Sequence, residues 1–238
     1  MNDSDQHDSD RAACVADLTR YLGEARDYRQ AAAADPEYAR RRDKLRNWQA
    51  SRLAATHADL LANPRYNAAA TFFLNEVYGP KDLSERDAEV EKIFPLLTSM
   101  LPVSALRALV MALEVDALSE RFDAAMVQAL GKKLNKEELT AAEYAVAYRK
   151  VGQRSSRELQ IRLIGETGEL LDSLSHKSFI RGALKMMHRP AQLAGLGELH
   201  GFLQRGFDAF RGMRDADEFL EKIVGRETEL MRELFTEP

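Results

Sequence analysis

The chain has 238 residues, with 34 lysines and arginines against 38 aspartates and glutamates, 45% hydrophobic residues and one cysteine. The formal net charge of −4 argues against a nucleic-acid-binding domain, which is usually basic, and the single cysteine, Cys14, excludes internal disulfides and multi-cysteine metal sites. The longest uncharged run, 93–106, is too short and too interrupted by proline to cross a bilayer. The aspartate-rich start does not resemble a secretory signal, so we expect a cytoplasmic protein without membrane insertion.

The first ten residues are acidic, polar and without periodicity, which predicts a disordered tail over 1–10. The four aspartates of this tail account for the whole net charge. After the tail, apolar side chains recur every three or four residues, a spacing typical of amphipathic helices and incompatible with strands. The pattern predicts an all-α fold with one helical domain over 11–238. The expected helices are 11–31, 36–62, 64–78, 84–101, 103–130, 140–151, 156–174, 178–188, 190–212 and 216–235.

Capping residues support these boundaries independently. Asp35 precedes a proline and is suited to cap a helix that starts there. Thr140 and Glu143 have the spacing of a capping box, and Gly131 is a plausible helix stop. The polar stretch 131–139 is a possible weak subdivision, although linkers of this length also join helices within one bundle.

Glycine is concentrated near the end of the chain, where nine of the 13 glycines lie between Gly165 and Gly225. Because a glycine inside a helix costs about 1 kcal/mol relative to alanine, something should offset this loss. Close approach of helices is the favoured interpretation, and a groove or bend that admits a ligand is the alternative.

Polar side chains interrupt several apolar helix faces, and they are the candidate site residues. His200 lies on the face Leu193–Leu196–Leu203–Phe207, while Glu166, Glu227 and Arg52 interrupt three others. One interpretation is an internal set of ion pairs, such as Arg52 with Glu166 or Glu227. The alternative is that Glu166, His200 and Glu227 meet in a polar pocket that binds a metal or transfers protons. A third hypothesis is that His200 alone is an axial ligand of a haem group. We predict no cofactor and no metal.

A basic run is the largest charge cluster and contains Arg40, Arg41, Arg42, Lys44 and Arg46. On a helix these side chains spread around most of the circumference, which favours a solvated, salt-bridged face. The alternative is a local patch for an anionic partner. Nucleic acid is disfavoured, because binding to it depends on many phosphate contacts from basic residues.

Seven residues resemble a known family signature. They read Phe72, Phe73, Leu74, Asn75, Glu76, Val77 and Tyr78. This stretch is similar to the motif of the bacterial "FFLEELY motif" family, with Asn75 and Val77 in place of Glu and Leu. The resemblance implies a bacterial, mainly helical protein, and it carries over no activity, substrate or catalytic residue.

No catalytic signature accompanies the helical pattern: phosphate-binding loops, nucleophile elbows and paired metal-binding histidines are missing from the sequence. The leading expectation is therefore a non-catalytic protein that acts through contact with a protein partner or as a homodimer. The alternative is a helical enzyme or binder of a small molecule, metal or haem, with a polar pocket near the glycine-rich C-terminal helices.

Overall fold

The computed structural model describes residues 3–77, 89–90, 92–95, 98–99 and 101–236, and within them it contains helices and turns and no strand. This confirms the all-α prediction. The first part of the chain forms α1 (Asp3–Ala34), α2 (Pro36–Thr56), α3 (Ala58–Ala62), α4 (Asn67–Phe72) and the π-helical turn η1 (Phe73–Val77). The second part forms α6 (Val103–Leu130), η2 (Gly131–Asn135), α7 (Ala141–Val151), α8 (Arg154–Ser175), α9 (Ser178–Leu193), α10 (Gly197–Met213) and α11 (Asp217–Phe235).

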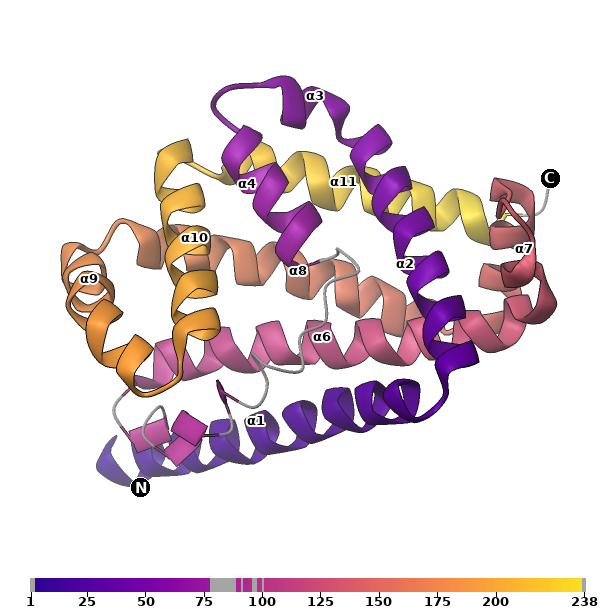
Figure 1. Cartoon of the computed structure of the whole chain (residues 1–238). Coiled ribbons are helices and arrows are strands. Elements are labelled where there is room, and N and C mark those ends of the chain that lie inside the picture. Colours follow the sequence, from indigo (N-terminus) through magenta and orange to yellow (C-terminus); the bar gives the residue numbers. More distant parts are fainter. Residues whose placement is uncertain (1–2, 78–88, 91, 96–97, 100, 237–238) are drawn as a thin grey trace.

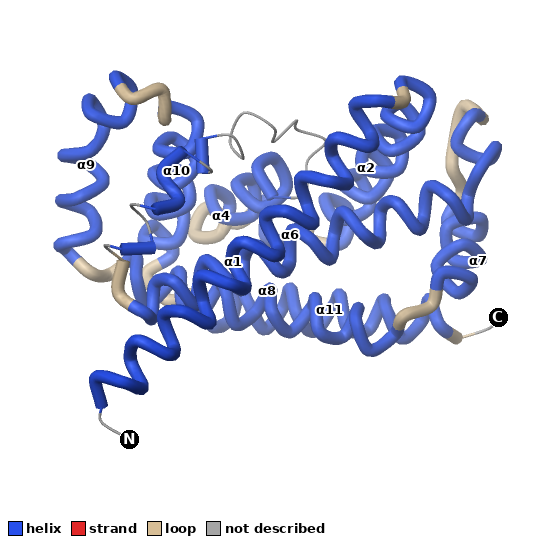
Figure 2. The backbone as a smooth tube through the Cα atoms, turned by 90° about the horizontal axis from the view of Figure 1, so that it is seen from below, coloured by secondary structure: helices blue, strands red, loops and turns tan. Residues whose placement is uncertain are grey.

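The long helix α6 runs through the centre of the molecule. It packs against α1 on one side and α8 on the other, and α2 and α7 contact its C-terminal half (Figures 1 and 2). Helix α11 lies along α8, whereas α9 and α10 form the opposite end of the molecule from α7. Every helix that surrounds the C-terminal half of α6 can therefore direct a side chain toward one interior region.

The expected caps form at the predicted places. The Asp35 side chain accepts hydrogen bonds from the Glu37 and Tyr38 backbone N–H groups at the start of α2. Thr140 and Glu143 complete a reciprocal capping box at the start of α7. Gly131 follows α6 with a φ of +52°, a conformation that residues with a side chain rarely adopt. These local signals fix where α2, α6 and α7 begin or end.

The expected disordered tail is corrected by the structure, because α1 already begins at Asp3. Two contacts hold this end against the rest of the molecule. Arg107 of α6 donates to the Asp10 carboxylate at 2.7 Å, and Arg11 donates to the Thr98 carbonyl at 2.6 Å. The acidic composition of the tail gave no indication of these two contacts, because residues far along the chain supply the partners. The helix extends through the tail.

Helix boundaries differ from the prediction at two further points. The expected helix 36–62 breaks at His57, where Arg226 donates to the Thr56 carbonyl and the Leu60 N–H turns to the His57 carbonyl instead. The expected break near residue 189 lies instead after Leu193, where Gly195 has a φ of +69° and Pro190 is accommodated inside α9. The expected helix 64–78 starts only at Asn67, and much of 84–101 lies outside the described residues.

Glycines of the C-terminal half allow close packing at two helix crossings. A Cβ atom at Gly168 of α8 would lie 2.4 Å from Leu220 Cδ2 of α11, and one at Gly206 of α10 would lie 2.8 Å from Phe72 Cζ. These contacts confirm the interpretation of close helix approach at both positions. Cys14 is likewise a buried core residue, packed with Leu18 and Leu22.

Among the described residues, none of the helices combines the length and the apolar character needed to cross a bilayer.

Candidate functional site

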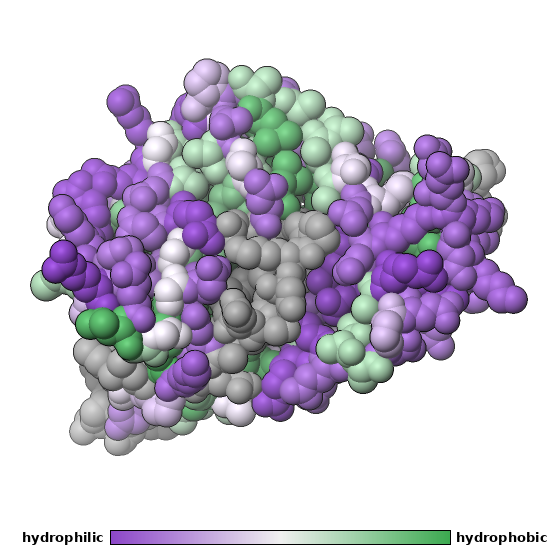
Figure 3. Space-filling model, in the orientation of Figure 1, coloured by the Kyte–Doolittle hydropathy of each residue, from purple (hydrophilic) through white to green (hydrophobic). Residues whose placement is uncertain are grey.

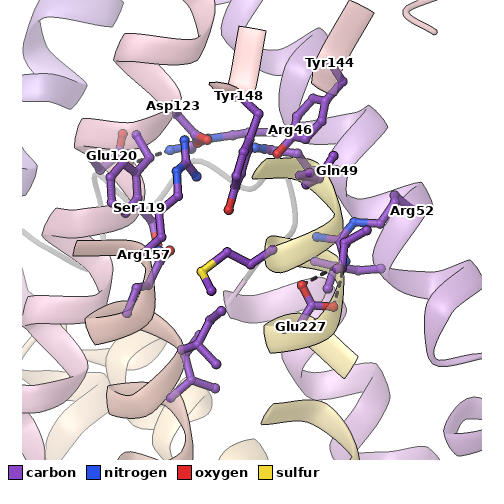
Figure 4. Close-up of a pocket in the computed structure, with 18 of the residues that line it drawn as sticks. Arg46, Gln49, Arg52, Ser119, Glu120, Asp123, Tyr144, Tyr148, Arg157 and Glu227 are labelled. Carbon is purple, nitrogen blue, oxygen red and sulfur yellow. Dashed lines mark hydrogen bonds and ion pairs between the residues drawn. The ribbon is translucent and has the colours of Figure 1, made fainter. Parts of the chain in front are cut away.

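A cavity of about 140 Å³ lies between α2, α6, α7, α8 and α11 (Figure 4). Charged and polar side chains form much of its wall: Arg46, Gln49, Arg52, Asp116, Ser119, Glu120, Asp123, Tyr144, Tyr148, Arg157, Gln160 and Glu227. Apolar side chains form the remainder: Leu53, Phe122, Ile161, Ile164, Leu230, Met231 and Leu234. This mixture of an apolar wall with converging polar groups is typical of small-molecule sites.

Carboxylates from α6 form the first side of the site. Glu120 is almost fully buried and accepts from Arg46 at 2.7 Å, while Asp123 accepts from the same guanidinium at 2.8 Å. Behind them, Arg29 of α1 binds Asp116 at 2.6 Å and Glu120 at 2.9 Å. Burial raises the pKa of Asp123, and the charge of Arg46 opposes this effect.

Glu227 of α11 forms the opposite side of the site. Both of its oxygens accept from Arg52 Nη1, at 2.6 and 2.8 Å, and His57 Nε2 donates to Oε1 at 3.1 Å. Burial by itself raises the pKa of Glu227, but the His57 hydrogen bond and the Arg52 charge together outweigh it and lower that pKa. Glu227 is thus a carboxylate held in its ionised form.

Tyrosines of α7 close one end of the cavity. Tyr144 stacks on Trp48 of α2 with the ring centroids 4.3 Å apart, and Tyr148 lies beside it. Burial raises the pKa of Tyr148 to about 12, against the opposing charge of Arg157. In Figure 4 the Tyr148 hydroxyl points toward the middle of the cavity. Both tyrosines therefore remain neutral near pH 7 and can act as hydrogen-bond donors.

Arg157, at the start of α8, completes the lining. Its Nε donates to the Gly152 carbonyl at 3.1 Å, and its guanidinium lies 3.7 Å from the Tyr148 ring centroid and 4.4 Å from that of Phe122. Beside it, Gln160 donates to the Ser119 hydroxyl at 2.8 Å. Arg157 is thus positioned by a carbonyl and two aromatic rings.

The four polar residues that the sequence predicted as site candidates, because they interrupt apolar helix faces, lie in three separate places. Arg52 and Glu227 pair directly, as the ion-pair interpretation expected. Glu166 is exposed and lies 3.6 Å from Arg162 on its own helix, while His200 is buried and donates to the Leu184 carbonyl at 2.8 Å. The structure therefore does not bring Glu166, His200 and Glu227 into one pocket. Within the described ranges, no group of three or more His, Cys, Asp or Glu side chains is arranged to hold a metal ion.

The basic run on α2 is not one surface patch. Arg46 is buried in the site, and Arg42 reaches Glu120 at 3.3 Å. Arg41 binds Glu37 and Asn135, and Lys44 donates to the Glu137 carbonyl at 3.0 Å. The fifth residue, Arg40, is exposed. The face is therefore salt-bridged, as the favoured interpretation expected, but two of its arginines point inward and are not solvated.

The seven-residue motif packs against the C-terminal helices. Phe72 is buried and contacts the Phe202 ring, and Phe73 contacts Phe210 and Phe219. Leu74 and Glu76 belong to η1, and Tyr78 lies outside the described residues. The two phenylalanines thus reach different neighbours because this part of the chain is surrounded by other helices.

The sequence contained a signal for the α6 side of the site that was overlooked. Helix α6 carries Asp116, Glu120 and Asp123 at helical spacing between Leu113 and Val127, so three carboxylates share one face with core residues. Helix α2 carries Arg42 and Arg46 at matching spacing. The carboxylates of α6 and the arginines of α2 are therefore complementary in charge. Arg157, by contrast, is near a helix start, where no pattern distinguishes it from a solvent-exposed arginine.

A family model described as "Domain of unknown function (DUF8198)" matches residues 28–238 of the chain. No curated protein and no solved structure matches it.

Proposed function

The chain belongs to the DUF8198 family, and we propose that it is a binding protein for a small molecule that occupies the cavity between α2, α6, α7, α8 and α11. One observation carries the proposal: the cavity, of about 140 Å³, is lined on one part by apolar side chains and on the other by hydrogen-bond donors from four different helices, α2, α6, α7 and α8. An engineered cavity of about 150 Å³ accommodates benzene, so a ligand whose apolar body is about the size of a benzene ring fits this cavity.

The ion pairs favour binding over catalysis. Each of the lining carboxylates Glu120, Asp123 and Glu227 is engaged by an arginine. A general acid or base works best with a pKa near the operating pH, whereas Glu227 has a lowered pKa and Tyr148 one of about 12. These groups are suited to orient a ligand.

The test is a fragment screen by ligand-observed NMR on the wild-type protein and on a variant with the cavity filled. Ile161→Phe places a larger apolar side chain in the wall, and Met186→Ala on the surface of α9 serves as the control. We expect fragments that bind the wild type and the control but not Ile161→Phe. Fragments that bind all three proteins equally, or no binding at all, would contradict the proposal.

We also propose that α9 contacts a protein partner, with a second copy of the chain as that partner. Exposed apolar side chains favour this: Met186 is 78% and Leu193 91% exposed. Arg181, Lys185 and Arg189 are exposed on the same helix. On the face shown in Figure 3, hydrophobic residues interrupt the hydrophilic surface at the end of the molecule that α9 forms. Large apolar groups on a surface often mark interaction sites.

Native mass spectrometry tests the second copy. We expect a dimer for the wild type and a monomer for Met186→Ser combined with Leu193→Ser. A wild type that stays monomeric, or a dimer that survives both substitutions, excludes a dimer through α9.

Cytoplasmic location, bacterial origin and membership of the "FFLEELY motif" family stay predictions from the sequence. The single cysteine supports the first, and the stretch from Phe72 to Tyr78 supports the other two.

A further inference from the structure

The most unusual group in the cavity wall is the guanidinium of Arg157. The residue is only 6% exposed. Its Nη2 atom is buried and, among the described residues, has no hydrogen-bond partner. Within the same residues, no carboxylate lies within ion-pair distance of Arg157, whose contacts include the Gly152 carbonyl, the ring of Phe122, and the ring and hydroxyl of Tyr148.

Burial of a cation without a counter-ion is unfavourable, and buried charges in proteins are normally paired. The ring faces of Tyr148 and Phe122 offset part of this cost through cation–π attraction. They do not replace a hydrogen-bond acceptor at Nη2. An anion in the cavity would supply both the missing acceptor and the missing charge.

The carboxylates of the cavity wall do not neutralise Arg157, because other arginines already bind them. The wall contains three arginines (Arg46, Arg52 and Arg157) and four carboxylates (Asp116, Glu120, Asp123 and Glu227). Arg46 and Arg52 bind Glu120, Asp123 and Glu227, while Arg29 and Arg42, which are not part of the wall, bind Asp116 and Glu120. Among the described residues, these ion pairs leave Arg157 without a carboxylate, and a carboxylate on a ligand would pair with it.

The shape of the site selects among anions. A guanidinium presents its N–H groups in a planar fork that matches the two oxygens of a carboxylate. The apolar residues Phe122, Ile161 and Ile164 line the same cavity, and a fully hydrated inorganic ion would gain nothing from them. A carboxylate attached to a short apolar body satisfies both parts of the wall.

We propose that the cavity binds a small monocarboxylate with a short apolar body, and that Arg157 is the residue that binds its carboxylate. This inference rests on the proposed function of the same cavity and names its ligand class. The neutral hydroxyls of Tyr144 and Tyr148 and the amide of Gln160 are among the further donors within the lining.

Isothermal titration calorimetry with matched probes tests the charge requirement. Benzoate and benzamide have nearly the same size and shape and differ in charge, and inorganic phosphate supplies the charge without the apolar body. We expect benzoate to bind the wild type more tightly than either of the others, by about tenfold or more, because it alone satisfies both the guanidinium and the apolar wall. Equal affinity for benzoate and benzamide, or tighter binding of phosphate, overturns the inference.

Variants test the role of Arg157. Arg157→Met should weaken benzoate binding by about tenfold or more, whereas Arg157→Lys, which keeps the charge, should restore part of the affinity. Arg162→Met, at an exposed position of the same helix, is the control and should leave affinity unchanged. If Arg157→Met binds benzoate as the wild type does, the residue is not the anchor. If Arg157→Met does not fold, the comparison of the three probes on the wild type decides.

Failure of this inference is distinguishable from failure of the proposed function. One outcome is that the cavity binds neutral fragments that Ile161→Phe no longer binds, and yet has no preference for benzoate over benzamide. This result refutes the assignment of a carboxylate ligand and leaves the proposed binding function intact. A cavity that binds neither the probes nor any fragment refutes both.

Discussion

Glu227 is held by residues that lie about 170 positions away in the chain, Arg52 and His57 at the end of α2. Its partners lie at the point where α2 breaks. The neighbouring Arg226 binds Asp59 at 2.6 Å and the Thr56 carbonyl at 3.1 Å. Two adjacent residues of α11 therefore fix the α2–α3 junction. Glu227 contributes a negative charge and Arg226 a positive charge.

Glu227→Gln should destabilise the protein by about 2–3 kcal/mol, because the amide leaves the partly buried Arg52 without its counter-charge. Urea denaturation followed by circular dichroism measures the change. Glu166→Gln is the matched control: Glu166 is exposed and lies 3.6 Å from Arg162, so its loss should change stability by less than about 0.5 kcal/mol. Equal effects of the two substitutions would refute the structural role of Glu227.

The lowered pKa of Glu227 also predicts a pH dependence. A carboxyl group with a folded-state pKa below its unfolded value stabilises the fold fully above the unfolded pKa, about 4.3 for glutamate. That contribution is lost as the pH falls below this value and through the folded pKa. The stability difference between the wild type and Glu227→Gln should therefore shrink as the pH falls from about 5 toward 3. Urea titrations at each pH measure it, and a difference that grows on acidification contradicts the prediction.

At the scale of elements, the crossing of α8 and α11 depends on two small residues. Gly165 faces Val224, and Gly168 faces the buried Leu220. A side chain at either position would push the helices apart or force a neighbour to move. Because both helices line the cavity, this crossing also sets the width of the site.

Gly168→Ala should destabilise the protein by about 1–3 kcal/mol, since the added Cβ would lie 2.4 Å from Leu220 Cδ2 in a packed core. Gly225→Ala on α11 is the control. Apart from its chain neighbours and the backbone of its own helix, no described atom lies within 4 Å of its added Cβ. The better helix propensity of alanine should therefore stabilise the fold by up to about 1 kcal/mol. Thermal melts should show a lower Tm for Gly168→Ala and a higher Tm for Gly225→Ala. Two Tm shifts in the same direction would contradict this account.

Sequence patterns predicted most helices because periodicity and caps are local. The boundaries at Asp35, Gly131 and Thr140 were found from residues within a few positions of each end. The break at His57 was not found, because it depends on Arg226, far along the chain. The first turns of α1 were missed for the same reason, since Arg107 supplies their partner. Local signals set helix ends only where tertiary contacts do not override them.

At the scale of the whole molecule, α6 connects the helices into one unit. It contacts α1, α2, α7 and α8, and the short connection through η2 returns the chain to α7 against α6 itself. The stretch 131–139, a possible subdivision in the sequence, thus joins neighbouring helices. Separation of α6 from any one of these helices would expose the apolar faces of both.

We therefore expect unfolding in one cooperative step. Far-UV circular dichroism reports helices throughout the chain. Near-UV circular dichroism reports the packing of aromatic side chains, such as Tyr66 and Phe210 in one core cluster and Tyr144 in another. The two transitions should have the same urea midpoint. Separate midpoints would show that the clusters unfold independently.

The candidate site was predictable in part. The pairing of Arg52 with a carboxylate, Glu166 or Glu227, followed from the cost of burying either side chain alone, and the structure selects Glu227. The α6 carboxylates form a stripe in the sequence that was not recognised, and the structure places this stripe against Arg42 and Arg46. Arg157 was not predictable, because only the three-dimensional fold shows that an arginine at a helix start is enclosed by Tyr148 and Phe122. The choice of Glu166 was wrong because its helix turns that residue to solvent.

The stack of Trp48 on Tyr144 has an optical consequence. The chain has a single tryptophan, and its ring lies 4.3 Å from the ring of a tyrosine that lines the cavity. All indole emission therefore originates beside the site, and a ligand that displaces water or shifts Tyr144 should change its intensity and wavelength. The protein thus carries an intrinsic fluorophore at the cavity, and titrations can be followed by emission without any label.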